Sequence, residues 1–270
     1  MFSPYYRWSG RTDPLNHCAI NVALYGPRAQ RWAMTERGRN SLSRDMDHLT
    51  IGPSSLNWDG QTLIINIDEV CAPLPRRIRG NVRLTPSFTN ANPFVLEDAG
   101  QHIWRPIAPL SRVEVDLSEP DLTWQGHGYF DMNAGAEPLD DAFETWTWSR
   151  ARVDDKAIIF YDAKRRRETD LSLALQVDRS GAFTSLPKPP IAPLPRGAWG
   201  VARETRADGG TANLARGFED SPFYTRSLVD AQILGVPVQS VHESLDLNRL
   251  KRGIVQVMLP FRMPRRSRWP

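Results

Sequence analysis

The chain has few cysteines and no long apolar run, and both absences narrow the classes of protein that it can be. Two cysteines among 270 residues, Cys18 and Cys71, allow at most one disulfide, which excludes a disulfide-stapled secreted scaffold. Apolar runs such as residues 157–161 fall far short of the roughly 20 residues that a membrane-spanning helix needs. The first residues have neither the basic nor the apolar region of an export signal, so we expect a cytoplasmic protein.

The sequence also lacks the motifs of common metal and nucleotide sites. Its five histidines include no HExxH motif, and no cysteine pair accompanies them, so no metal site is predicted. There is no GxGxxG followed by an acidic residue and no Walker loop, and the GxSxG elbow of serine hydrolases is missing. We therefore expect an activity that uses no cofactor.

Positive charge is modest in sum but unevenly distributed. The formal net charge is only +3, yet residues 164–167 are all basic, and residues 261–269 mix arginine with aromatic and apolar residues. Such a mixture favours contact with an anionic membrane surface, where each Lys or Arg contributes about 1 kcal/mol. A solvated tail is the alternative interpretation. No nucleic-acid-binding motif accompanies the charge, so we expect no nucleic-acid partner.

The dominant hydrophobic period is two residues, as in half-buried strands. With 22 prolines and hardly any helical stripe, the sequence predicts an all-β protein of sandwich or barrel type. We expect two domains, residues 1–120 and 121–270, with the proline-rich residues 185–195 as a long loop inside the second. The predicted strands are 78–84, 113–117 and 171–177, and, less cleanly alternating, 61–68, 157–162 and 254–259.

Two strand-like stretches, residues 101–106 and 124–132, place reactive groups on one face each. These groups are His102 and Trp104 in the first stretch, and His127, Tyr129 and Asp131 in the second. In an ordinary half-buried strand the polar face is solvated, so the pattern alone does not decide between a site and a plain surface. Trp146 and Trp148 also alternate with polar residues. Such a pair more often belongs to a core, although it could line an apolar pocket.

Long blocks of sequence, more specific than any single motif, carry a resemblance to a known family. The blocks are residues 1–6, 16–26 (NHCAINVALYG), 31–38 (RWAMTERG), 127–135 (HGYFDMNAG), 219–224 and 259–265. They resemble the carotenoid 1,2-hydratases of purple phototrophic bacteria, also called hydroxyneurosporene synthases. The family is similar to a broader group with two lipocalin-like β-domains, which includes plant tocopherol cyclases and fungal cyclases of the Diels–Alder type. The resemblance therefore implies two lipocalin-like barrel or sandwich domains with an apolar cavity within or between them.

The resemblance also implies a set of site residues. The family's functional set is a His-x-Trp followed by a Tyr-x-Asp, which fall here on His102 with Trp104 and on Tyr129 with Asp131. His102 is as far from Tyr129 along the chain as Trp104 is from Asp131, which is expected if two strands offer matching positions to one site. Contact with an acyclic carotenoid substrate is expected for Trp146, Trp148 and His127.

These groups suit the addition of water to a carbon–carbon double bond. Asp131, kept neutral by an apolar wall, could protonate C2 of the terminal alkene. Trp104 and Tyr129 could stabilise the cation at C1 by roughly 1–2 kcal/mol each. His102 could hold or deprotonate the attacking water, or it could only orient Asp131 by a hydrogen bond.

Three other functions fit parts of the sequence. A cyclase or isomerase of a lipophilic polyene would use the same acid but add no water. A carotenoid carrier would need the cavity but no acid directed into it, and a membrane-surface scaffold would need only the basic tail. The full pattern favours a hydratase that associates peripherally with the inner membrane.

Overall fold

In the computed structural model, residues 3–27 and 29–266 are described, and they form two compact units. Unit 1 contains residues 87–110 and 129–255, and unit 2 contains the described residues of 2–86, 111–128 and 256–270. Two long strands, β10 (His102–Glu119) and β11 (Asp121–Gly135), contribute residues to both units. The predicted division between residues 120 and 121 stays a prediction.

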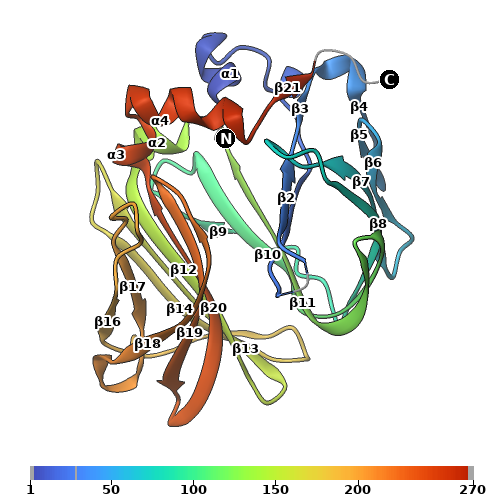
Figure 1. The fold of residues 1–270 in the computed structure, drawn as a ribbon. Coiled ribbons are helices and arrows are strands. Elements are labelled where there is room, and N and C mark those ends of the chain that lie inside the picture. The colour runs from blue at the N-terminus through green and yellow to red at the C-terminus, as the bar shows by residue number, and fades with distance from the viewer. Residues whose placement is uncertain (1–2, 28, 267–270) are drawn as a thin grey trace. The chain divides into compact units, whose positions relative to one another are not determined.

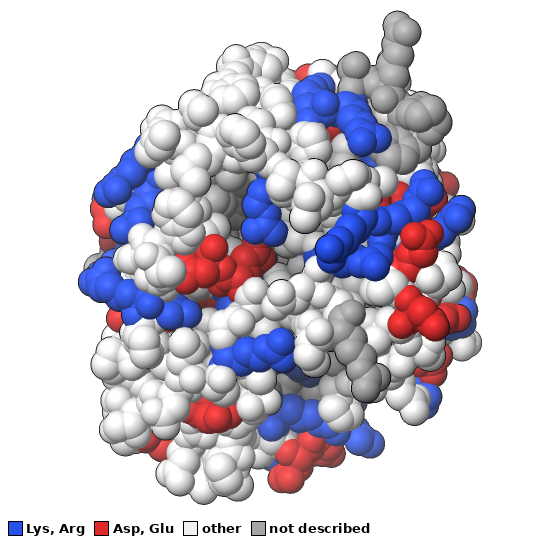
Figure 2. Space-filling view, in the orientation of Figure 1, with Lys and Arg blue, Asp and Glu red and all other residues white. Residues whose placement is uncertain are grey.

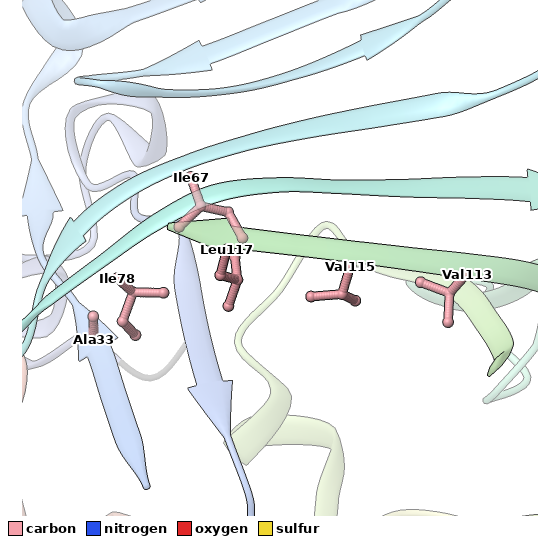
Figure 3. Packing of buried hydrophobic residues seen from close by; sticks show 6 residues of the cluster. All are labelled: Ala33, Ile67, Ile78, Val113, Val115 and Leu117. Carbon is pink, nitrogen blue, oxygen red and sulfur yellow. The ribbon is translucent and has the colours of Figure 1, made fainter. Parts of the chain in front are cut away.

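Unit 2 is built on one large antiparallel sheet (Figure 1). Its strand order is β11-β10-β8-β7-β6-β5-β4. The bounds of the strands not yet given are β4 Leu42–Arg44, β5 His48–Ile51, β6 Ser54–Trp58, β7 Leu63–Val70 and β8 Arg77–Pro86. Alternation along β10 buries Val113, Val115 and Leu117 and exposes the residues between them. These three pack with Ala33, Ile67 and Ile78 into the core of the unit, as Figure 3 shows.

Short elements complete unit 2. They are α1 Pro4–Trp8, η1 Pro14–Asn16, β1 Asn21–Leu24, β2 Arg31–Met34, β3 Glu36–Arg37, η2 Arg39–Ser41, η4 Leu259–Phe261 and β21 Arg265–Arg266. Strand β1 pairs with β2, and β21 lies parallel to β3. A polar anchor joins these elements to the sheet, because Arg37 on β3 and Glu69 on β7 form an ion pair in which both side chains are fully buried. Gly52 leaves room for the guanidinium, which a Cβ atom at that position would overlap.

Unit 1 contains a second large antiparallel sheet, in the order β15-β14-β13-β12-β20-β19-β18 (Figure 1). Its strands are β12 Phe143–Val153, β13 Lys156–Arg165, β14 Leu171–Val177, β15 Phe183–Ser185, β18 Ala212–Asp220, β19 Tyr224–Ile233 and β20 Val236–Asp246. The hairpin of β16 (Ile191–Leu194) and β17 (Arg203–Arg206) contacts this sheet, since Thr205 donates a hydrogen bond to Ser149 at 3.3 Å. Ala151, Ile158 and Phe160 lie in its apolar core.

The remaining elements of unit 1 are short, and one helix joins the two units along the chain. They are β9 Phe94–Val95, which pairs with β10, α2 Leu139–Ala142, η3 Asp208–Gly210, α3 Leu247–Leu250 and the joining helix α4 Gly253–Met258. No helix of the described residues has both the length and the apolar character needed to span a bilayer.

The all-β prediction is confirmed, and five of the six predicted strands overlap β7, β8, β10, β13 and β14. The prediction of a strand at residues 254–259 is wrong, because this segment forms α4 and the first residue of η4. Burial there does not alternate: Val255 and Gln256 are buried side by side, with exposed residues on either side. A short apolar run does not by itself distinguish a strand from a helix.

Two further expectations need correction in detail. Residues 185–195 are not one long loop, because Ser185 ends β15 and residues 191–194 form β16, which pairs with β17. The two large sheets are open rather than closed into barrels. Extended proline-rich segments can still form edge strands, since proline lacks only the donor of a ladder hydrogen bond.

Candidate active site

The carboxyl group of Asp131 is the centre of a polar cluster in unit 1. The Trp104 indole Nε1 on β10 donates a hydrogen bond to Asp131 Oδ2 at 2.8 Å. The Tyr129 hydroxyl, two residues away on β11, donates to the same oxygen at 3.0 Å. Strand geometry explains the arrangement, because residues two apart lie on one face and neighbouring strands bring such faces together. Three of the four predicted catalytic residues are therefore in direct contact.

An aromatic layer packs against this cluster. The ring centroid of Trp104 is 5.2 Å from that of Tyr161 on β13, and the ring of Tyr129 is 5.1 Å from that of Trp148 on β12. Trp146 lies 6.2 Å from Tyr161. The two predicted substrate-binding tryptophans are thus grouped with the carboxyl group. Tyr161 was not predicted, because its strand reads as a plain apolar run and only the pairing of β13 with β12 places it there.

Sheet register orders this layer into a row across five strands, which we call the central row. Residues directly opposite each other in an antiparallel sheet lie on the same face. Trp148 is opposite Tyr161 on one side and opposite Glu243 on the other. The central row consists of Arg226, Glu243, Trp148, Tyr161 and Leu173, on β19, β20, β12, β13 and β14. It combines one ion pair with two aromatic rings that carry polar atoms.

The electrostatics of the cluster favour a neutral carboxyl group. Burial raises the pKa of Asp131, and the negative charge of Glu243 adds to that rise. The hydrogen bonds from Trp104 and Tyr129 oppose it, but the pKa stays above its usual range. Burial also holds the pKa of Tyr129 well above its usual range, so its hydroxyl remains a donor. The site can therefore present a carboxylic acid next to aromatic surfaces.

His102 lies on the same strand face as Trp104 but outside the hydrogen-bonded cluster. Its ring packs edge-on against Phe143, 5.2 Å between centroids, and its Nε2 is 3.7 Å from Glu137 Oε1. Neither ring nitrogen has a hydrogen-bond partner among the described residues, so the structure gives no hydrogen bond by which His102 would orient Asp131. Burial lowers the pKa of His102, which favours the neutral ring. Gly135 makes room for it, because a Cβ atom there would overlap the imidazole.

His127 is the one predicted site residue that falls outside unit 1. It is exposed on β11 and belongs to unit 2, whereas the other six predicted residues belong to unit 1. A role for His127 in binding substrate stays a prediction. Among residues 3–27 and 29–266, no three His, Cys, Asp or Glu side chains are grouped so that they could hold a metal ion.

Comparison with known proteins places the chain in a family. All of residues 1–270 match the family model described as Carotenoid hydratase CrtC. The chain belongs to the carotenoid hydratase family. Its relatives include the acyclic carotenoid 1,2-hydratase of Thiocapsa roseopersicina, 50% identical over 98% of this chain and 67% of that protein. Another is the acyclic carotenoid 1,2-hydratase of Cereibacter sphaeroides, 44% identical over 100% of this chain and 96% of the relative. The family predicted from the sequence blocks is confirmed.

A solved structure supports the fold. The crystal structure of an AttH protein from Nitrosomonas europaea matches with a TM-score of 0.54 and 13% identity, covering 84% of this chain and 85% of that one. At this identity the similarity shows the fold alone, which is of the lipocalin-like type.

Proposed function

We propose that the chain adds water across the C1–C2 double bond of acyclic carotenoids, with Asp131 as the acid. The observation that carries this proposal is a half-buried carboxyl group with a raised pKa, held by Trp104 and Tyr129 against an aromatic layer. The named relatives are acyclic carotenoid 1,2-hydratases, and this chain matches them over nearly its whole length. The substrate class in the proposal comes from those relatives.

The first step is protonation of the alkene at C2. An isolated alkene is a poor base, so the acid has to be neutral and held against the π face. Both hydrogen bonds to Asp131 end on Oδ2, which leaves Oδ1 as the oxygen that would carry the acidic proton. An apolar surrounding that keeps a carboxyl group neutral near neutral pH is an established way to make such an acid.

The second requirement is stabilisation of positive charge at C1, a tertiary centre. Trp104 and Tyr129 both contact the carboxyl group through their polar atoms, and the ring of Trp148 packs on Tyr129. A cation over such a ring face gains about 2 kcal/mol or more when water is excluded. We propose that these rings stabilise the cation while the Asp131 carboxylate left by proton transfer balances its charge.

His102 stays a candidate for holding the attacking water or for taking its proton. Its ring nitrogens have no hydrogen-bond partner among the described residues, and its pKa is lowered by burial, so the neutral ring could accept a proton. Against this role, the side chain is almost completely buried and directed towards Phe143 and Glu137.

The direct test is incubation of the purified chain with lycopene or neurosporene in detergent micelles, followed by mass analysis. We expect products heavier than the substrate by one or two waters, with the new hydroxyl on C1. Products of unchanged mass would indicate a cyclase or isomerase instead. Stoichiometric binding without turnover would indicate a carrier, and either result contradicts the proposal.

We also propose that the chain meets its substrate at a membrane surface, since long polyenes reside in lipid. Phe261, with 70% of its surface exposed, and Val257, with 59%, are apolar side chains in the C-terminal segment of unit 2. The basic groups nearby are partly used within the protein, because Arg262 lies over the ring of Trp32 at 4.4 Å and Arg265 pairs with Glu36. Residues 267–269 of the predicted basic tail lie outside the described residues.

The basic run at residues 164–167 supports this surface less well. Arg165, Arg166 and Arg167 form ion pairs with Glu168, Glu144 and Glu137. Basic and acidic groups are also interspersed over the face shown in Figure 2. The exposed apolar side chains therefore carry the proposal, rather than an unpaired basic patch.

Phe261→Ser tests the membrane contact. Burying a phenylalanine side chain contributes about 1.5–3 kcal/mol, so we expect binding to anionic lipid vesicles to weaken by roughly tenfold or more. Co-sedimentation with vesicles measures this. Leu74→Ser, which changes an exposed residue between β7 and β8, serves as the matched control. Equal binding by the wild type and the Phe261 variant would contradict the proposal.

A further inference from the structure

The hydration reaction requires a group that receives the proton of the attacking water. Asp131 gives its own proton to carbon, and the water that then bonds to C1 must lose one. His102 is one candidate from the sequence, but its ring packs on Phe143 and lies near Glu137, outside the hydrogen-bonded cluster of Asp131. The central row offers a second carboxyl group in Glu243.

Register and packing place Glu243 near the polar cluster of Asp131. Glu243 on β20 is directly opposite Trp148 on β12. The ring of Trp148 packs on Tyr129, and Tyr129 donates its hydroxyl hydrogen bond to Asp131. The charge of Glu243 also contributes to the raised pKa of Asp131, as expected for two carboxyl groups that lie near each other. Arg226 and Arg150 are also charged groups near these residues, the first through its effect on Asp131 and the second over the Tyr129 ring at 5.5 Å.

Arg226 holds the carboxylate of Glu243 in position. Its Nε and Nη2 donate to Glu243 Oε1 at 2.9 and 2.5 Å. The other oxygen, Oε2, accepts no hydrogen bond from the described residues. About 22% of the Glu243 side chain is exposed, so water can reach it. Glu243 is thus a carboxylate held by Arg226 through Oε1, with Oε2 left for a further donor.

Two buried donors in the central row have no acceptor among the described residues. They are the Trp148 indole Nε1 and the Tyr161 hydroxyl. A buried donor without a partner costs about 1–3 kcal/mol, and such atoms are usually satisfied by water. Both belong to residues next to each other in the row, and Trp148 is also next to Glu243. The row therefore has the polar atoms to hold a water molecule beside a carboxylate.

From this arrangement we propose that Glu243 is the catalytic base of the hydration, and that Trp148 and Tyr161 hold the water that it deprotonates. The inference rests on the proposed function. In the reaction the Asp131 O–H bond breaks and a C2–H bond forms, which leaves a cation at C1 and a carboxylate at Asp131. A water O–H bond then breaks as the C1–O bond forms, and the proton goes to Glu243. Exchange with solvent returns Glu243 to its carboxylate and Asp131 to its acid, so water is the sole reactant consumed besides the carotenoid.

If Asp131 protonates C2 and Glu243 deprotonates the water, mutation should separate these two steps. Glu243→Gln keeps the size of the side chain but removes the base, and we expect hydration to fall by about 10²–10³-fold. Protonation of C2 by Asp131 should survive, because that group is intact. In D2O Asp131 delivers a deuteron to C2, and the cation can then lose the original C2 hydrogen or a hydrogen of a methyl group on C1, so the recovered polyene should still gain deuterium. Asp131→Asn should instead lower hydration and deuterium uptake together, by about 10²–10⁴-fold.

Three controls make the result decisive. Glu144→Gln changes an acidic residue on β12 that pairs with Arg166 at 3.6 Å, and it should leave both readouts unchanged. His102→Gln tests the competing base: if that variant, and not Glu243→Gln, keeps deuterium uptake while losing hydration, then His102 is the base. Thermal unfolding of each variant shows whether it is folded.

Two outcomes would overturn the role of Glu243. One is hydration by Glu243→Gln at the wild-type rate, which would mean that Asp131 or His102 takes the proton. The other is parallel loss of hydration and deuterium uptake in a folded Glu243→Gln variant, which would indicate a structural role. If the wild type itself adds no water to the substrate, the proposed function fails rather than this inference alone.

Discussion

Replacement of Asp131 by asparagine is expected to lower the rate of carotenoid hydration by about 10²–10⁴-fold. The asparagine side chain has nearly the same shape, and its carbonyl oxygen can still accept the hydrogen bonds from Trp104 and Tyr129. What it lacks is a proton that can be transferred to carbon. Product formation under saturating substrate measures the effect, with Asp121→Asn, an exposed position on the same strand, as the control.

The same variant should not lose stability at neutral pH. Because the pKa of Asp131 is raised in the folded protein, its contribution to stability is present at low pH and is lost as pH rises through the folded pKa. Asparagine is neutral throughout, so the variant should be at least as stable as the wild type at neutral pH. Thermal unfolding of both proteins at acidic and neutral pH checks the direction of this pH dependence of stability. Wild-type activity should also fall as pH rises through that pKa. Full activity of a stable asparagine variant would exclude Asp131 as the acid.

The second large effect concerns the fold of unit 2. Arg37→Met is expected to reduce the free energy of unfolding by about 3–5 kcal/mol, because it leaves the charge of Glu69 buried without its partner. Arg37 donates to both Glu69 oxygens, at 3.2 and 2.9 Å, and the Ser54 hydroxyl donates to Glu69 Oε1 at 2.7 Å. Denaturant unfolding measures the loss.

Two comparisons identify the cause of that loss. Adding Glu69→Leu to the Arg37 variant removes the unpaired charge, so the double variant should be more stable than Arg37→Met alone. Arg39→Ala removes an exposed ion pair with Asp13 on the same unit and should cost no more than about 1 kcal/mol. If Arg37→Met and Arg39→Ala had equal effects, burial would not be the reason for the importance of Arg37.

The alternation of apolar and polar residues predicts the strands well. It also predicts the contact between the His-x-Trp and Tyr-x-Asp pairs, because both depend on local strand geometry. Trp104 and Asp131 meet as their strand positions suggested. The segment at 254–259 was wrongly predicted as a strand because its apolar run is too short to show a period. Tyr161 and Glu243 could not be predicted as site residues at all. Their place depends on which strands are neighbours and in what register, and β20 lies next to β12 although more than 80 residues separate them in the chain.

Gly135 has a consequence for how the histidine can be studied. It is the last residue of β11, and the imidazole of His102 occupies the space that a side chain at this position would fill. Gly135→Ala would displace the imidazole, and no ionisable side chain in the protein would be replaced. Substitution of Gly135 would therefore change the position of the His102 ring without replacing the histidine itself.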